Sequence, residues 1–197
     1  MFRAFVAIDL PEEICASLTA AQARLKPASA GVKVAWTKAE NLHLTLQFLG
    51  RIPESQVEKI SAALADVAGR HAPLDVTVAG VGAFPDAVRP RLLWLGCGDA
   101  GGKLAALAGA VREVMTQLGF VPDKHEFTAH LTLGRVKVPR ADAALTQALD
   151  SIKKDAFGTL RVAAIHFYKS QLHPDGSVYT KLSSHALKGD SPHAAKS

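Results

Sequence analysis

The tetrapeptide His-Leu-Thr-Leu occurs twice in the chain, once in "HLTLQFLG" and once in "HLTLGRV". Both copies have the composition of strands, in which successive side chains point to opposite faces. One face therefore presents His43 with Thr45 in the first copy and His130 with Thr132 in the second. The leucines point to the other face, where they anchor each strand in a core.

Two imidazoles that face one atom predict general acid–base catalysis, because an imidazole pKa lies near neutral pH and one ring accepts a proton while the other donates one. The hydroxyls of Thr45 and Thr132 would donate to the non-bridging oxygens of a phosphate, and Arg135 would add a fixed cationic fork. These groups fit phosphoryl transfer without a metal, since the charge of the transition state meets donors already in place. Phe48, just past the first copy, is the best candidate for stacking on a nucleobase.

The two motif histidines are 87 residues apart. This spacing is too long for a solenoid repeat and suits two copies of one half-domain. If a pseudo-twofold axis relates the halves, the polar faces of the two motifs meet across a cleft and form one symmetric site. A duplication in which both copies are inert and only build strands would produce the same pattern.

With 197 residues, 48% of them hydrophobic, the chain is long enough for one domain with a sizeable core and has no membrane span. The formal net charge of +5 favours anionic partners such as nucleotides, RNA or phosphorylated metabolites. Residues 1–98 hold 10 basic and 9 acidic side chains, whereas residues 99–197 hold 13 and 9. A basic surface is therefore expected in the second half.

Cys15 and Cys97 are the only cysteines, and neither forms a CxxC pair or has a histidine nearby at metal-ligand spacing. We expect no disulfide, no bound metal and no cofactor, and both thiols are expected to be buried. The apolar N-terminal stretch is too short for a signal peptide, which predicts a cytoplasmic protein without membrane attachment. The remaining histidines are unpaired and are expected at surface or partly satisfied positions: His71, His125, His166, His173, His185 and His193.

Apolar periodicity and turn residues predict an alternation of helices and strands. The predicted strands are residues 2–9, 32–37, 42–49, 74–84, 91–97, 129–136, 158–170 and 177–187. The predicted helices are residues 11–26, a segment after Pro53 whose apolar face is Val57, Ile60, Ala63, Leu64 and Val67, residues 103–119 ending at Gly119, and residues 141–150. A turn at "HPDG" joins the last two strands. Helices mixed with hairpin-linked strands indicate an α+β fold with mostly antiparallel sheets, in one two-lobed domain over residues 1–187 followed by a disordered tail, 188–197.

The two His-Leu-Thr-Leu motifs, together with several stretches around them, are similar to those of the two-histidine (2H) phosphoesterases. Within that superfamily the chain most resembles the RNA 2′,3′-cyclic phosphodiesterases, also named 2′-5′ RNA ligases. The resemblance covers residues 2–185, and beyond the two motifs it rests on "FVAIDLP", "RPRLLWLG", "FTAHLTLGR" and "SQLHPDGSVY". Ala129 departs from the pattern, since many relatives carry Pro before the second motif histidine.

The resemblance implies two pseudo-symmetric halves with flanking helices and an active-site cleft between the lobes. The implied reaction is metal-independent hydrolysis of a 2′,3′-cyclic phosphate to a 2′-phosphate, with ATP-independent 2′-5′ joining of RNA ends as its reverse-type reaction. We assign His130 as the base that activates water and His43 as the acid that protonates the departing O3′, and the exchanged roles stay open because the two halves are nearly equivalent chemically. Thr45, Thr132 and Arg135 would hold the phosphate oxygens.

The expected partner is RNA with 2′,3′-cyclic phosphate ends, because a cyclic phosphate requires a 2′-hydroxyl, and no obligate protein partner is implied. Two alternatives remain open. The same site would also act on small cyclic nucleotides or on an ADP-ribose cyclic phosphate. Alternatively, the chain would be a non-catalytic module that binds RNA ends.

Overall fold

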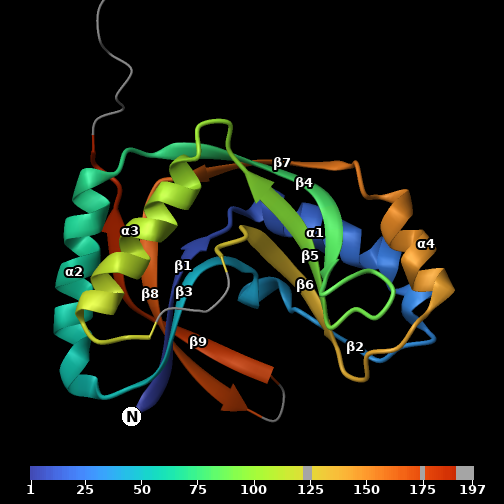
Figure 1. Cartoon of the computed structure of the whole chain (residues 1–197), viewed down its shortest axis with the longest axis horizontal. Coiled ribbons are helices and arrows are strands. Elements are labelled where there is room, and N and C mark those ends of the chain that lie inside the picture. Colours follow the sequence, from blue (N-terminus) through green and yellow to red (C-terminus); the bar gives the residue numbers. More distant parts are fainter. Residues whose placement is uncertain (122–125, 174–175, 190–197) are drawn as a thin grey trace, which may run out of the picture.

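The computed structural model describes residues 1–121, 126–173 and 176–189, and these form an antiparallel sheet that curls between two groups of helices (Figure 1). The strands are Phe2–Asp9 (β1), Val34–Trp36 (β2), His43–Ile52 (β3), Leu74–Phe84 (β4), Leu92–Gly98 (β5), His130–Val136 (β6), Ala156–Val162 (β7), Ala164–His173 (β8) and Gly176–Ala186 (β9). The helices are Glu12–Leu25 (α1), Val57–Arg70 (α2), Lys103–Gln117 (α3) and Ala143–Ser151 (α4), with short 3-10 turns at Pro27–Ser29, Ala39–Asn41 and Glu54–Gln56. The predicted α+β class is confirmed.

The sheet consists of two four-strand groups that meet at the motif strands. Its order is β7-β4-β5-β6-β3-β1-β8-β9, with β2 attached to the edge of β6. The groups are joined through β3 and β6, which share a single pair, Leu44 opposite Leu131. Beyond this pair the strands separate, and β2 pairs with β6 instead. The repeated motif therefore lies where the sheet divides into two lobes.

The helices cover the two groups separately. Helices α2 and α3 pack on each other and against β9 and β3, whereas α1 and α4 pack on each other and against β7 and β4. Each forms where the sequence provides both an apolar face and terminal signals. In α2, for example, Ile60, Leu64 and Val67 are fully buried at helical spacing.

Charged and capping residues set the helix ends. Helix α1 begins after Pro11 with Glu12 and Glu13 in its first turn, where carboxylates offset the positive end of the helix dipole. Helix α4 begins at Asp142, whose side chain accepts a hydrogen bond of 2.9 Å from the amide of Leu145. Helix α3 ends before Gly119, whose φ of 89° is in the left-handed region typical of glycine after a helix.

The predicted single strand over residues 158–170 is wrong, because the structure has two strands there. Strand β7 pairs with β4 in one lobe and β8 pairs with β1 in the other, so the chain changes lobes at Ala163. The continuous apolar pattern gave no sign of this change, since both strands bury one face.

Two other predictions fall partly outside the described residues. Strands β8 and β9 form the predicted hairpin, but residues 174–175 of its turn lie outside. Residues 190–197 of the predicted disordered tail also lie outside the described residues. The amides of Lys188 and Gly189 donate to the carbonyls of Ala68 and His71, so the ordered chain continues past residue 187.

The motif leucines anchor both strands in the core as predicted. Leu44, Leu131 and Leu133 are fully buried, and Leu46 is 6% exposed. Burial of such side chains contributes about 1.5–3 kcal/mol each, which holds the opposite, polar face of both strands in place. Among the described residues, no helix has the length and apolar character needed to cross a bilayer.

Candidate active site

The two histidine–threonine pairs lie on one face of the sheet, next to each other. Because the central leucines of the motifs are directly paired, the antiparallel register places His43 opposite Thr132 and Thr45 opposite His130. The two histidines are thus diagonal neighbours, with Cβ atoms about 7–8 Å apart. All four side chains are half-buried. The register thus brings both imidazoles and both threonine hydroxyls to one part of the sheet.

Both imidazoles are oriented in the same way. Nδ1 of His43 lies 2.8 Å from the carbonyl oxygen of Asn41, and Nδ1 of His130 lies 2.7 Å from that of Thr128. A carbonyl oxygen only accepts, so Nδ1 of each ring carries the hydrogen. The other nitrogen, Nε2, is therefore the atom that exchanges protons with a ligand.

A β-bulge in each motif strand brings a further residue to the histidine face. The register between β1 and β3 shifts by one residue after Thr45, and the register between β5 and β6 shifts after Thr132. Simple alternation would have pointed Phe48 and Arg135 to the leucine face. Instead, the bulge reverses the alternation, as bulges next to active sites commonly do.

Contacts confirm where the two re-aimed side chains lie. The Phe5 ring stacks on His43 at 4.8 Å and also contacts the ring of Phe48 at 6.0 Å, so Phe48 shares the face of His43. The guanidinium of Arg135 is close enough to lower the pKa of His43 by charge repulsion. Both side chains are exposed, and their roles in substrate binding stay predictions.

A buried glutamine holds the bulge in β6. Nε2 of Gln22, on α1, donates to the carbonyl of Leu133 at 2.9 Å and to the carbonyl of Thr37 at 2.8 Å. The amide of Thr37 also donates to the Leu133 carbonyl, at 2.9 Å. The Leu133 carbonyl, which lies at the bulge, thus accepts two hydrogen bonds inside the core, as a buried carbonyl requires.

The surroundings of the two histidines differ. His43 packs between Phe5 and the edge of Tyr179, with ring centroids 4.8 and 5.4 Å away. Burial lowers the pKa of His43, an effect only partly offset by its hydrogen bond to Asn41 and by the charge of Asp9. The neutral form of this imidazole is therefore favoured in the free protein.

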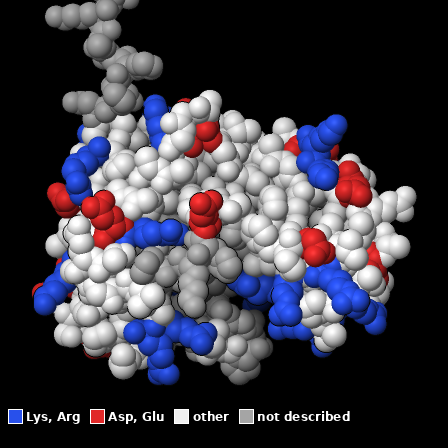
Figure 2. Space-filling view, in the orientation of Figure 1, with Lys and Arg blue, Asp and Glu red and all other residues white. Residues whose placement is uncertain are grey.

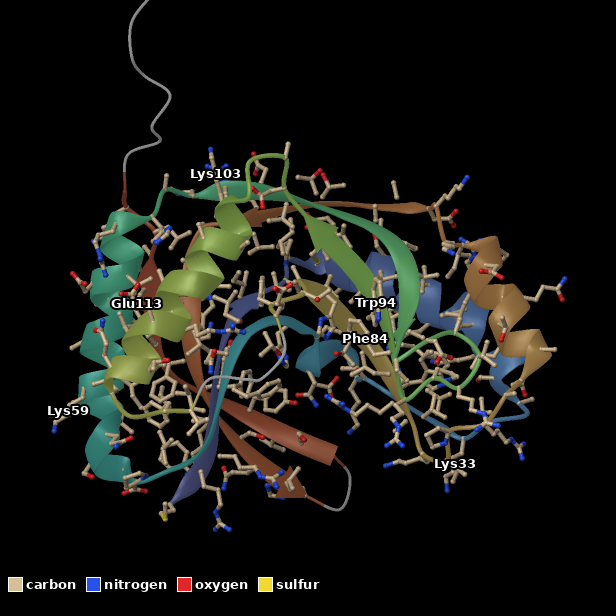
Figure 3. All side chains as sticks on the ribbon, viewed as in Figure 1. Lys33, Lys59, Phe84, Trp94, Lys103 and Glu113 are labelled. Atoms are coloured by element: carbon tan, nitrogen blue, oxygen red, sulfur yellow. The ribbon has the colours of Figure 1, made fainter. Side chains whose placement is uncertain are left out.

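His130 lies in the other lobe, where it contacts the edge of Phe84 with ring centroids 5.3 Å apart. Phe84 in turn packs against Trp94 of β5, as Figure 3 shows. Among the described residues, fewer aromatic rings contact His130 than contact His43. The pseudo-symmetric site therefore has one aromatic side and one more open side.

This arrangement agrees with comparisons to known proteins. The family described as LigT like Phosphoesterase matches the chain twice, over residues 8–94 and 95–179. The two matches divide the chain so that each contains one histidine motif. The chain belongs to the LigT-like phosphoesterase family. The two copies of the His-Leu-Thr-Leu motif belong to the two half-domains that the family model matches, which confirms the predicted duplication.

Relatives of this phosphoesterase from several organisms bear one name. A protein of Archaeoglobus fulgidus is 36% identical over 91% of this chain and 97% of its own length, and one of Methanothermobacter thermautotrophicus is 32% identical over 91% and 96%. Both are named RNA 2′,3′-cyclic phosphodiesterase. The enzyme class expected from the sequence, a hydrolase of phosphodiesters, is confirmed.

Solved structures share the fold of this phosphoesterase. The protein TT0787 of Thermus thermophilus superimposes with a TM-score of 0.81 at 30% identity, covering 96% of this chain and all of the other. Escherichia coli LigT in complex with 3′-AMP superimposes with a TM-score of 0.75 at 26% identity, covering 94% and 98%. The single domain of two repeated halves is thus an established architecture.

Sequence reasoning missed the aromatic side of the site. Phe5 and Tyr179 contact His43, Tyr168 stacks on Phe5, and Phe84 contacts His130, yet none was singled out from the sequence. Phe5 and Tyr179 do lie in "FVAIDLP" and "SQLHPDGSVY", stretches that carried the family resemblance. Their presence there was the available signal, but only the strand pairing of β1, β8 and β9 brings them to His43.

The other residues considered from the sequence lie apart from the proton-exchanging atoms. His166 is buried, with Nε2 3.5 Å from Asp9 and Nδ1 without a partner among the described residues, which fits the expected partly satisfied position. Cys15 and Cys97 are half-buried free thiols, so they are less buried than predicted. In the described ranges, no three His, Cys, Asp or Glu side chains form a group suited to a metal ion.

Proposed function

We propose that this phosphoesterase hydrolyses 2′,3′-cyclic phosphate ends of RNA to 2′-phosphates without a metal ion. The observation that carries the proposal is the pair of adjacent histidine–threonine motifs, in which each imidazole bonds a backbone carbonyl through Nδ1 and keeps Nε2 for proton exchange. The name shared by the relatives supports the choice of substrate.

In the proposed reaction Nε2 of His130 takes a proton from water, whose oxygen forms a new bond to phosphorus. The bond between phosphorus and O3′ breaks, and His43 gives its proton to O3′. Thr45, Thr132 and Arg135 donate to the non-bridging oxygens, where negative charge increases in the transition state. No step requires a metal, because the side chains supply the acid, the base and the countercharge.

A row of cations on the His130 side favours an RNA strand over a small cyclic nucleotide. On β6, Lys137 follows Arg135 by two residues and so points to the same face, about 6.6 Å further along. The amide of Lys137 donates to the carbonyl of Lys33 at 2.8 Å, which places these two residues side by side. All three side chains are exposed.

This row is available to a ligand. Within the residues that the structure describes, no ion pair joins Arg135, Lys137 or Lys33 to a carboxylate. Figure 2 shows Lys and Arg gathered at the lower right, where Figure 3 labels Lys33. A row of unpaired cations that begins at the phosphate site suits successive phosphates of a single strand.

The same geometry supports 2′-5′ joining as the reverse-type reaction. A 5′-hydroxyl of a second RNA would replace water as the nucleophile on the His130 side. The alternatives are a phosphodiesterase of small cyclic nucleotides or of an ADP-ribose cyclic phosphate, which would not need the cationic row, and a non-catalytic RNA-end-binding module, which would not need two exchangeable imidazoles.

The test is turnover of an oligoribonucleotide that ends in a 2′,3′-cyclic phosphate, in the presence of EDTA. We expect a 2′-phosphate product from the wild type and a loss of at least about 100-fold for His43→Ala and for His130→Ala, as for a lost general acid or base. Equal turnover by all three proteins, or binding without turnover by the wild type, would contradict the proposal. Loss of activity with EDTA would contradict the metal-free mechanism.

A further inference from the structure

The last residue of β1 lies directly opposite the first residue of β3, and these two residues are Asp9 and His43. Directly opposed residues of an antiparallel pair share one face of the sheet, with Cβ atoms about 4.5–5.5 Å apart. Both side chains also line one pocket, of about 430 Å³. Strand pairing therefore puts a carboxylate beside the imidazole of the first motif histidine.

Side chains of β8 and β9 hold this carboxylate in place. Oδ1 of Asp9 accepts a hydrogen bond from the hydroxyl of Tyr168, and Oδ2 accepts one of 2.7 Å from Nζ of Lys181. Nε2 of His166 lies 3.5 Å from Oδ2. Burial raises the pKa of the Asp9 carboxyl, but the two hydrogen bonds and the charges of His166 and Lys181 outweigh burial and hold this pKa below its usual value. Asp9 is therefore ionised at any pH at which an imidazole titrates.

A stack of rings connects Asp9 to His43. Tyr168, which donates to Asp9, stacks on Phe5 with ring centroids 5.3 Å apart, and Phe5 stacks on His43 at 4.8 Å. Phe5 is only 3% exposed, and closely packed buried rings have little room to move. The position of the imidazole relative to the carboxylate is thus fixed by the packing of three strands, β1, β3 and β8.

The charges around His43 oppose one another. Burial lowers the pKa of His43, and the guanidinium of Arg135 on β6 lowers it further, whereas a backbone carbonyl and the charge of Asp9 raise it. On α1, burial and the charges of Asp9 and Glu12 raise the pKa of the Cys15 thiol, which therefore stays neutral and adds no charge. Among the described side chains that shift the pKa of His43, Asp9 is the one that favours the imidazolium.

We propose that Asp9 is a positioning residue for general acid catalysis, whose carboxylate keeps the packed imidazole of His43 in its proton-carrying form. This inference rests on the proposed function, in which His43 gives a proton to O3′. Nδ1 of the imidazole is bonded to the carbonyl of Asn41, so Asp9 neither receives nor donates the proton and acts by its charge. A carboxylate near an imidazole favours the charged form, which is the form that a general acid needs.

Three variants test the charge of Asp9. Asp9→Asn removes the charge and keeps an oxygen that accepts from Tyr168, so the ring stack is retained. Lys181→Gln removes the cation that offsets the charge of Asp9. Asp75→Asn is the matched control, because Asp75 also forms a cross-strand ion pair, 3.1 Å from Arg161, in the other lobe.

NMR titration of the His43 ring in the free protein gives the first result. We expect Asp9→Asn to lower the pKa of His43 by about one pH unit or more, the usual effect of losing an adjacent opposite charge. Lys181→Gln should raise this pKa, because the charge of Asp9 is then less neutralised. Asp75→Asn should leave it as in the wild type. A role in folding alone would not produce shifts of opposite sign.

The pH dependence of kcat/KM on adenosine 2′,3′-cyclic phosphate gives the second result. Above its pKa, an imidazole loses its charged form about 10-fold for each pH unit. Asp9→Asn should therefore lose about 10-fold or more of kcat/KM at the alkaline end of the profile. It should lose little at the acid end, where His43 carries its proton in both proteins.

The outcomes separate this inference from the proposed function. An unchanged pKa of His43 in Asp9→Asn, or an equal loss of kcat/KM at both ends of the profile, would overturn the role of Asp9 while leaving the cyclic phosphodiesterase activity established. If the wild type hydrolysed no cyclic phosphate, the proposed function would fail. The titrations need no turnover, so they would still decide whether Asp9 sets the charge of His43.

Discussion

At the residue scale, the two histidines that begin the same sequence motif differ in their surroundings. His43 is enclosed by Phe5 and Tyr179, whereas His130 contacts the edge of Phe84. The proposed reaction uses His43 as the acid beside the leaving oxygen and His130 as the base that activates water. Burial favours a neutral His43 in the free protein, so its proton as a general acid must be stabilised by the bound anion.

This difference predicts how His43 titrates. Burial disfavours the charged imidazolium, so the pKa of His43 in the free protein should lie below the usual 6.5. Adding adenosine 2′-monophosphate should raise it, because a phosphate anion beside the ring favours the charged form. NMR titration of the ring, assigned with His43→Gln, measures both values. A free-protein pKa above 6.5, or no rise with the nucleotide, would contradict this account.

The roles of the two histidines predict a selective rescue. A substrate whose bridging 3′-oxygen is replaced by sulfur has a leaving group that needs no general acid. We expect His43→Ala to regain most of its lost activity on this substrate, while His130→Ala stays impaired by about 100-fold or more because its base is missing. Rescue of His130→Ala instead would show that the roles are reversed.

At the element scale, the bulge in β6 decides whether Arg135 reaches the site. Gln22 holds the bulge by satisfying two buried carbonyls from α1. We expect Gln22→Ala to reduce the free energy of unfolding by about 1–3 kcal/mol, because two hydrogen bonds of about 0.5–1.5 kcal/mol each are lost, while the Leu133 carbonyl keeps the Thr37 amide as a donor. Urea unfolding monitored by tryptophan fluorescence measures this change.

The same substitution should also weaken phosphate binding, because Arg135 loses its fixed direction. Thr19→Ala, on the exposed side of the same helix, is a matched control and should leave phosphate affinity as in the wild type. Full stability and unchanged phosphate affinity in Gln22→Ala would show that the backbone maintains the bulge without the glutamine.

At the scale of the whole molecule, the two lobes carry different side chains on the two sides of the motif strands. The lobe of β3, β1, β8 and β9 contributes rings, and the lobe of β6 and β2 contributes cations. If the proposed function holds, we expect an RNA substrate to bind in one orientation, because its bases and its phosphates require different surroundings.

This asymmetry predicts a dependence on RNA length and on salt. The double variant Lys33→Glu/Lys137→Glu should lose more kcat/KM on a cyclic-phosphate oligoribonucleotide than on the mononucleotide. Its activity on the oligonucleotide should also fall less steeply with salt, by about one unit of slope for each phosphate contact removed. Lys59→Glu, an exposed residue of α2 at the far left of Figure 3, is the control and should behave as wild type. Equal losses on both substrates would contradict an RNA-binding row.

The chemistry of the site could be predicted because it depends on local patterns. A two-residue spacing in a strand places His and Thr on one face whatever surrounds the strand, and the repeat of the motif predicts that two such faces meet. Arg135 and Phe48 were included in the predicted site for chemical reasons, although alternation alone would have pointed them away. The shifts of register that turn these two side chains to the histidine face leave no recognisable pattern in the sequence of the bulges.

By itself, the sequence determined the α+β class, most helices and strands, the duplication and the histidine–threonine pair on one face of each motif strand, because each follows from spacing within a few residues. Tertiary structure alone decided the division of residues 158–170 between two lobes, the enclosure of His43 by Phe5 and Tyr179, and the row from Arg135 to Lys33. These features depend on which strands become neighbours. Which strands become neighbours depends on the burial of whole sheet faces, and residues far apart in the chain contribute to each face together.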